Sequence, residues 1–133
     1  MPPVNATGND GVWVVVPAYK EAARIQHTLE ELVQKFPNVI VVDDGSPDES
    51  GAIARSCGAW VLRHPINRGQ GAALQTGIDF ALIKGATDLL ADVLNKPPGL
   101  TFVVIQEVEL EDWGVNGQPA AEHRRQAADK SPG

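Results

Sequence analysis

The chain has 133 residues, a hydrophobic content of 43%, a charged content of 21% and a formal net charge of −6. This length is enough for one domain of modest size. The acidic balance argues against a general nucleic-acid or membrane-surface binder, because such a protein needs a basic face. The only cysteine, Cys57, excludes an internal disulfide framework and fits a reducing compartment, so we expect a cytoplasmic protein. No stretch approaches the roughly 20 apolar residues of a membrane-spanning helix, and we expect no transmembrane segment.

Strands and helices alternate along the first two-thirds of the sequence, after a Pro-, Gly- and Asn-rich stretch at 1–11 that predicts a flexible terminus. The apolar runs and periodic patterns predict strands at 12–16, 39–42 and 59–62, and helices at about 21–36, 46–58 and 73–85. In the second helix, Ser46, Pro47 and Glu49 predict a capping box. This order with short connections predicts an α/β fold with a parallel, Rossmann-like sheet and flanking helices.

The character of the sequence changes after residue 86. We expect a divergent segment at 87–113, with a weak helix that stops at Pro97, a strand at 100–105 and an acidic edge strand at 106–112. Residues 114–133 are rich in Gly, Pro, Ala, Gln and charge, and they predict a disordered tail.

The run that ends in Asp43 and Asp44 is the most informative feature of the chain. An apolar strand stops at two carboxylates, and in open α/β folds ligands bind at the carboxyl edge of the sheet. Carboxylates there can accept hydrogen bonds from ribose hydroxyls or a base, and a pair can attract a cation. The alternative interpretation is that the two acids only stabilise the turn and helix that follow.

Two further segments are predicted to meet the same edge. Tyr19 could stack on a base and Glu21 could accept from it, although an acid there also simply favours a helix N-terminus. The loop 67–71 places glycines before a helix, where a phosphate can bind, but Leu74 stands where a G-x-G-x-x-G motif needs its third glycine. His64 precedes this loop, and an isolated histidine is more often an ordinary surface or core residue than a catalyst.

Together these segments resemble the family-2 glycosyltransferases, in particular the branch of dolichyl-phosphate mannose and glucose synthases. The matching stretches are VVPAYKE at 15–21, IVVDDGSPD at 40–48, Gly58-Ala59 and HPINRGQGAALQTG at 64–77, so the resemblance covers about 12–86. It implies a GT-A type nucleotide-binding half that takes a UDP- or GDP-linked sugar. It also implies Mg²⁺ or Mn²⁺ as cofactor and inverting transfer to a polyprenyl phosphate or glycan. By this resemblance the nucleotide-sugar site comprises Pro17, Ala18, Tyr19, Glu21, Asp43, Asp44, Arg68, Gly69 and Gly71.

The segment after residue 86 departs from the family pattern. The family has an Asp-x-Asp-like motif there, which holds a metal that neutralises the diphosphate leaving group. Asp88 and Asp92 do not form that motif, and Glu109 with Glu111 reads as a solvated edge strand rather than a substitute metal site. We therefore expect neither a metal site nor a catalytic base in this chain.

The sequence thus predicts a donor-binding half that is incomplete for catalysis. A non-catalytic nucleotide-binding module and a truncated or frame-shifted, non-functional fragment are the alternatives. The face that would meet the missing half is expected to be exposed and to favour self-association.

Overall fold

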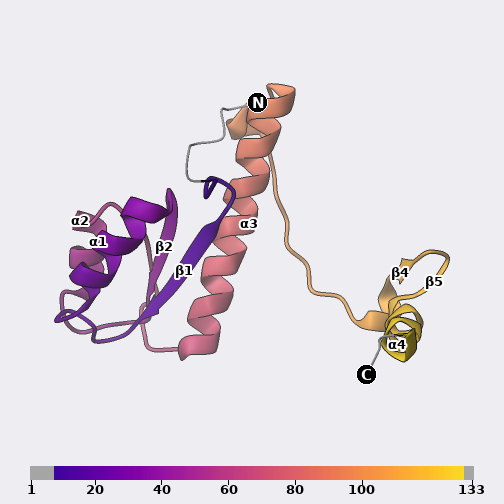
Figure 1. The fold of residues 1–133 in the computed structure, drawn as a ribbon, viewed down its shortest axis with the longest axis horizontal. Helices are drawn as coiled ribbons and strands as arrows, with labels where there is room; N and C mark the ends of the chain where they lie inside the picture. Colours follow the sequence, from indigo (N-terminus) through magenta and orange to yellow (C-terminus); the bar gives the residue numbers. More distant parts are fainter. Residues whose placement is uncertain (1–7, 131–133) are drawn as a thin grey trace. The chain divides into compact units, whose positions relative to one another are not determined.

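The computed structural model describes residues 8–130. They form two compact units that divide between Val103 and Val104. The first unit is a three-stranded sheet with helices on both faces, and the second is a short hairpin with one helix (Figure 1). No helix within residues 8–130 combines the length and the apolar character that crossing a bilayer demands.

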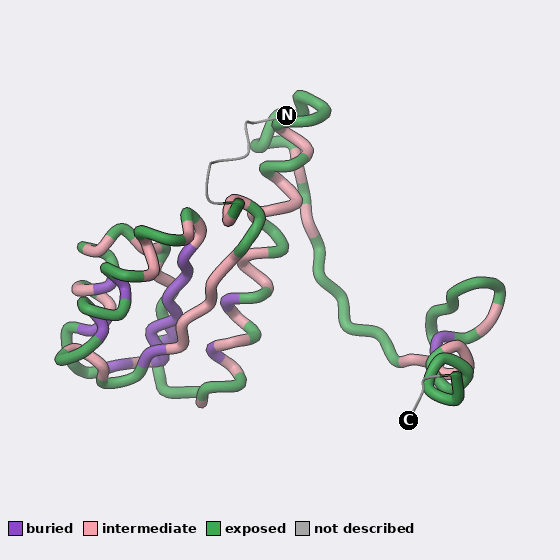
Figure 2. The backbone as a smooth tube through the Cα atoms, in the orientation of Figure 1, coloured by how far each residue is buried: buried purple, intermediate pink, exposed green. Residues whose placement is uncertain are grey.

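The sheet of the first unit is parallel, with the strand order β1-β2-β3. Its strands are β1 (Trp13–Ala18), β2 (Asn38–Asp43) and β3 (Trp60–Arg63). The central strand is the most deeply buried, because Val39–Val42 are each at most 2% exposed (Figure 2). Ala18 pairs with Asp43, and Asp43 pairs with Arg63, so the three strands end at one edge. The predicted α/β fold with a parallel sheet is confirmed.

Helices cover both faces of this sheet, and the alternation of side chains along β2 decides which face meets which helix. On one face, Val39 and Val41 pack in a core with α1 (Ile25–Lys35) and α2 (Ser50–Ser56). On the other face, Ile40 and Val42 pack in a second core with α3 (Gln70–Leu94). Figure 1 shows α1 and α2 on one side of β1 and β2, and α3 on the other.

Helix boundaries differ from the prediction in each of the three helices, and the first helix begins at Ile25 rather than near residue 21. The helix expected to end near Gly85 continues to Leu94, where Asn95 turns into the left-handed region with φ 53°. A lone glycine costs about 1 kcal/mol relative to alanine in a helix, which is too little to end one whose flanking residues favour it. The predicted capping box does not form, because α2 begins only at Ser50 and the Ser46 hydroxyl accepts a hydrogen bond from the Lys20 amide.

The predicted strands at 100–105 and 106–112 are not formed. The described structure has short 3₁₀ helices at Pro98–Leu100 (η1) and Leu110–Asp112 (η2), with extended chain between them. Several apolar side chains of this segment are exposed to solvent, among them Phe102 at 89% and Val104 at 84%. A strand forms only where a partner strand supplies its hydrogen bonds, and no such pairing is present within the described residues.

The second unit corrects the prediction of a disordered tail for residues 114–130, while residues 131–133 of that prediction lie outside the described part of the chain. β4 (Gly114–Val115) and β5 (Gln118–Pro119) form an antiparallel hairpin, followed by α4 (Ala120–Lys130). The turn between the strands is Asn116-Gly117, and both residues have positive φ. Asn-Gly is the preferred sequence for a two-residue hairpin turn, so this signal was present in the chain.

Candidate functional site

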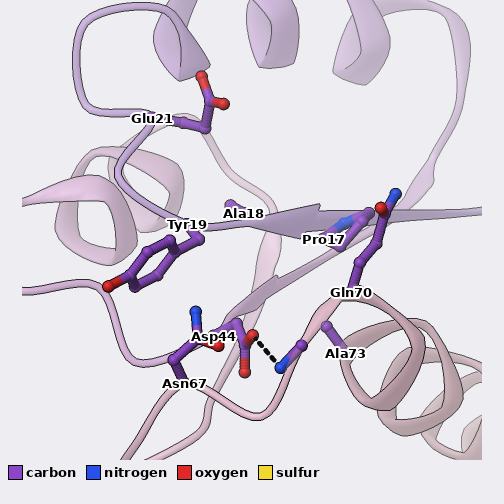
Figure 3. Close-up of a pocket in the computed structure, with 9 residues that line it drawn as sticks. Pro17, Ala18, Tyr19, Glu21, Asp44, Asn67, Gln70 and Ala73 are labelled. Atoms are coloured by element: carbon purple, nitrogen blue, oxygen red, sulfur yellow. Dashed lines mark hydrogen bonds between the residues drawn. The ribbon is translucent and has the colours of Figure 1, made fainter.

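A cavity of about 350 Å³ opens at the carboxyl edge of the sheet (Figure 3). Residues from the ends of β1 and β2, the loop before α3 and the first turn of α3 line it: Pro17, Ala18, Tyr19, Glu21, Asp44, Asn67, Gly69, Gln70 and Ala73. The structure thus brings together most of the residues that the sequence predicted for a nucleotide-sugar site. Asp43, Arg68 and Gly71 are the predicted site residues that do not line this cavity.

Asp44 is buried at the end of β2 and holds the loop before α3. Its Oδ1 accepts a hydrogen bond from the Arg68 amide at 2.8 Å, and its Oδ2 accepts one from the Gly69 amide at 2.8 Å. Its Oδ1 also lies 2.7 Å from Nδ1 of His64. The Arg68 amide, followed by the His64 side chain, lowers the pKa of Asp44, so the carboxylate is ionised at neutral pH. Arg68 therefore contributes to the site through its backbone.

Asp43 lies on the opposite face of the sheet and has a structural role. Its Oδ1 accepts a hydrogen bond from the Ser46 amide at 3.0 Å, and its Oδ2 lies 3.9 Å from Nε of Arg63. A Cβ added to Gly51 in α2 would lie 2.7 Å from this Oδ2, so α2 packs directly on the carboxylate. The first of the two acids thus stabilises the turn, as one sequence interpretation proposed for both.

The turn after β2 also fixes the loop that carries Tyr19 and Glu21. The Lys20 amide donates to the Ser46 hydroxyl at 3.1 Å, and the Glu21 amide donates to the Ser50 hydroxyl at 2.9 Å. Asp48 accepts from the amide and the hydroxyl of Ser50, and the Ser50 hydroxyl is the main cause of the lowered pKa of Asp48. These bonds hold one wall of the cavity in place.

Three lining residues were not predicted as site residues: Asn67, Gln70 and Ala73. Asn67 and Gln70 place side-chain amides at the cavity, and each amide can both donate and accept hydrogen bonds. Both stand in the NRGQG stretch, so polar side chains directly before a helix N-terminus were a usable signal. Gly71 lies in the first turn of α3, where an added Cβ would meet nothing within 4 Å.

The described residues do not fit a divalent metal. Within residues 8–130 there is no group of three or more His, Cys, Asp or Glu side chains that could hold an ion. Asp88 is engaged by Lys84 at 2.9 Å on α3. Glu111 lies in η2 rather than on a strand beside Glu109, so the paired strand face that a substitute site would need is not formed.

Comparison with known proteins assigns the first part of the chain. The model of glycosyl transferase family 2 matches residues 13–83, more than half of the sequence. The chain belongs to glycosyl transferase family 2. An uncharacterized protein of Methanocaldococcus jannaschii is 46% identical over 81 residues, which are 60% of this chain and 33% of that protein. The 4,4'-diaponeurosporenoate glycosyltransferase of Staphylococcus aureus is 45% identical over 51 residues, 37% of this chain and 14% of the relative.

This family 2 chain also matches part of a solved structure. Glucosyl-3-phosphoglycerate synthase of Mycobacterium tuberculosis matches with a TM-score of 0.40 and 33% identity, over 46% of this chain and 26% of that one. The chain therefore spans about a third or less of the length of the glycosyltransferases and the archaeal relative that it matches.

A second family accounts for the departure after residue 86. The model of tautomerase enzymes matches residues 80–122. Probable tautomerase K2 of Dickeya dadantii is 49% identical over 47 residues, 35% of this chain and 70% of that protein. The two family matches overlap inside α3, so one continuous helix joins a glycosyltransferase segment to a tautomerase segment. The later segment is therefore not a frame-shifted glycosyltransferase sequence, because such a sequence would not be similar to another family.

Proposed function

We propose that the cavity at the carboxyl edge of the sheet binds the nucleoside part of a UDP- or GDP-linked sugar. The chain would then act as the donor-binding part of a family 2 glycosyltransferase. The observation that carries this proposal is the ionised Asp44 at the end of β2, which lies in one cavity with Tyr19 and the amide side chains of Asn67 and Gln70.

The chemistry of the lining residues suits a nucleoside. Tyr19 is 41% exposed and its ring can stack on a base, and ring stacking of this kind is worth about 1–3 kcal/mol per base in nucleic-acid binding proteins. Glu21 can accept hydrogen bonds from ribose hydroxyls or base N–H groups, and Asp44, which already accepts three hydrogen bonds, has room for one more. The free amides at the N-terminus of α3, which begins at Gln70 beside the cavity, favour the negative charge of a diphosphate.

Transfer of the sugar is not part of what we propose for this chain alone. A diphosphate leaving group develops negative charge, and family members commonly neutralise it with a divalent metal that the described residues do not fit. For the acceptor of the complete reaction we propose a polyprenyl phosphate or a glycan, in the cytoplasm. The acceptor follows from the resemblance of residues 12–86 to the dolichyl-phosphate synthases, and the compartment follows from the single cysteine, Cys57, which fits a reducing environment.

Nucleotide binding is expected to be measurable by calorimetry and independent of Mn²⁺. UDP or GDP should bind with a Kd below about 1 mM, and Tyr19→Ala should weaken that binding about tenfold by removing the stacking ring. Tyr19→Phe is the matched control, because it keeps the ring and should bind within about threefold of the parent chain. No binding of either nucleotide below millimolar concentration would refute the proposal, and a requirement for Mn²⁺ would show that a metal site exists.

Tautomerase chemistry is a second candidate, favoured by the match over residues 80–122. Tautomerisation moves a proton between carbon and oxygen and needs a side chain that acts as acid and base. In the second unit, Glu111, Asp112 and Trp113 line a hollow of about 500 Å³ with Gly114, Gly117, Gln118 and Pro119.

Ultraviolet absorbance of a 2-keto acid, whose keto and enol forms differ in spectrum, measures this activity directly. We expect no acceleration over buffer, because the acids of this hollow, Glu111 and Asp112, are exposed to solvent rather than enclosed in a pocket that would hold a substrate against them. Acceleration that is lost in Glu111→Gln and kept in Glu107→Gln would instead establish the second candidate.

A further inference from the structure

His64 is a buried residue behind the cavity that the proposed function does not use. It follows β3 directly and is only 6% exposed. Its ring bridges two elements, since Nδ1 lies 2.7 Å from Oδ1 of Asp44 and Nε2 lies 2.9 Å from Oγ1 of Thr76 on α3. Both ring nitrogens are therefore engaged, and the ring does not line the cavity. His64 thus contacts Asp44, the carboxylate that accepts the Arg68 and Gly69 amides of the loop before α3, and this contact connects it to the cavity.

The chemistry of Asp44 determines where the ring proton lies. An ionised carboxylate only accepts hydrogen bonds, so Nδ1 of His64 must carry a proton and donate it. The Thr76 hydroxyl can donate to Nε2 or accept from it, and it is compatible with either charge state of the ring. His64 is thereby oriented from both sides, with the donor facing Asp44.

Asp44 has little accepting capacity left for a ligand. A carboxylate offers about four lone-pair positions, and three are taken by His64 and by the amides of Arg68 and Gly69. The bonds from the Arg68 and Gly69 amides to Asp44 hold the loop before α3 in place. The side chains of Asn67 and Gln70, which flank these two residues, line the cavity. Asp44 therefore affects the cavity mainly by fixing the position of this loop, and less by binding a ligand through its remaining lone pair.

We propose that His64 is a positioning residue of the nucleotide cavity. Its ring, anchored by Thr76, donates from Nδ1 to Asp44 and keeps that carboxylate turned toward the amides of Arg68 and Gly69. The assignment rests on the proposed nucleotide site, and it names a residue that acts through Asp44 without touching the ligand.

Two substitutions at His64 distinguish the effect of its hydrogen-bond donor from the effect of the size of its ring. His64→Leu removes the donor, and it should weaken UDP or GDP binding about tenfold, the loss expected for one hydrogen bond to a charged group. It should also speed hydrogen exchange at the Arg68 and Gly69 amides. His64→Asn keeps a donor near the Nδ1 position and should bind within about threefold of the parent chain. The exposed His27 of α1 offers a matched control, because His27→Leu makes the same chemical change away from the site and should alter neither readout.

Nitrogen chemical shifts of the His64 ring give a readout that does not depend on ligand. We expect a protonated Nδ1 in the folded chain, and a Thr76→Val variant that retains this proton but exchanges the Arg68 and Gly69 amides faster. An unprotonated Nδ1 would overturn the proposal, as would a folded His64→Leu variant with unchanged amide exchange.

The same experiments distinguish failure of this inference from failure of the proposed function. If the parent chain binds no nucleotide, the nucleotide proposal fails while amide exchange and ring shifts still decide the role of His64. If His64→Leu does not fold, His64→Asn and Thr76→Val carry the test. The proposal is supported if the Arg68 and Gly69 amides exchange faster in Thr76→Val and remain protected from exchange in His64→Asn. Unchanged protection in Thr76→Val refutes it.

Discussion

Asp44→Ala is expected to reduce the affinity for UDP or GDP at least about a hundredfold and to unfold the loop before α3. The substitution removes the acceptor for His64 and for the amides of Arg68 and Gly69 at once. Buried donors that lose their acceptor are costly, so the melting temperature should also fall by roughly 5 °C or more. Asp44→Asn should behave similarly, because its NH₂ group would face N–H donors.

Calorimetric titration and thermal melts check this expectation. The control is Asp92→Ala, which removes an exposed carboxylate from the far end of α3 and should leave both measurements unchanged. Nucleotide affinity that survives in Asp44→Ala would show that the carboxylate does not organise the cavity.

Gly77→Ala is expected to destabilise the first unit by about 1–3 kcal/mol, the usual cost of extra volume in a packed interface. Gly77 is buried in α3, and a Cβ there would lie 2.3 Å from Cγ1 and 3.2 Å from Cγ2 of Val15 on β1. Val15 is held in the sheet by its pairing with β2, so the helix must move away from the strand.

Urea unfolding measures the free energy of unfolding of Gly77→Ala, and Gly71→Ala in the same helix is the control. Gly71→Ala meets no atom within 4 Å and should stabilise the fold by about 0.5–1 kcal/mol, because alanine favours the helix. Combining Gly77→Ala with Val15→Ala should recover part of the loss, since the second change removes the clashing methyl groups. Equal stability of Gly77→Ala and Gly71→Ala would show that α3 does not pack on β1 this closely.

The sequence contained enough information to predict the edge of the sheet at which the cavity lies. Apolar runs fixed the strands, and the acids at the end of β2 marked the edge where the cavity forms. The separate roles of the two acids follow from alternation along a strand. Asp43 continues the face of Val39 and Val41, toward α2, and Asp44 continues the face of Ile40, toward α3. Assigning those faces required knowing which helix covers which side, and that is tertiary information.

The latter part of the chain was less predictable for physical reasons. The residues after 86 were compared only with the pattern of family 2. That comparison did not predict that α3 begins in the segment that matches family 2 and ends in the segment that matches tautomerases. Apolar residues at 100–105 favour a strand, but a strand needs a partner that the local sequence does not reveal. The charged composition after residue 114 favoured a prediction of disorder, although the segment forms a short hairpin and a helix. Asn116-Gly117 is a hairpin signal that could have predicted the hairpin.

A ¹H–¹⁵N correlation spectrum recorded during titration with UDP and GDP tests the proposed nucleotide cavity most directly. We predict dispersed peaks, with shifts concentrated at Tyr19, Asp44 and the loop from Asn67 to Gln70, and with the amides of residues 104–130 unchanged. The nucleotide that saturates first identifies the base. Peaks that do not respond at several times the expected Kd, or that shift only within residues 104–130, would contradict a nucleotide site at the carboxyl edge of the sheet.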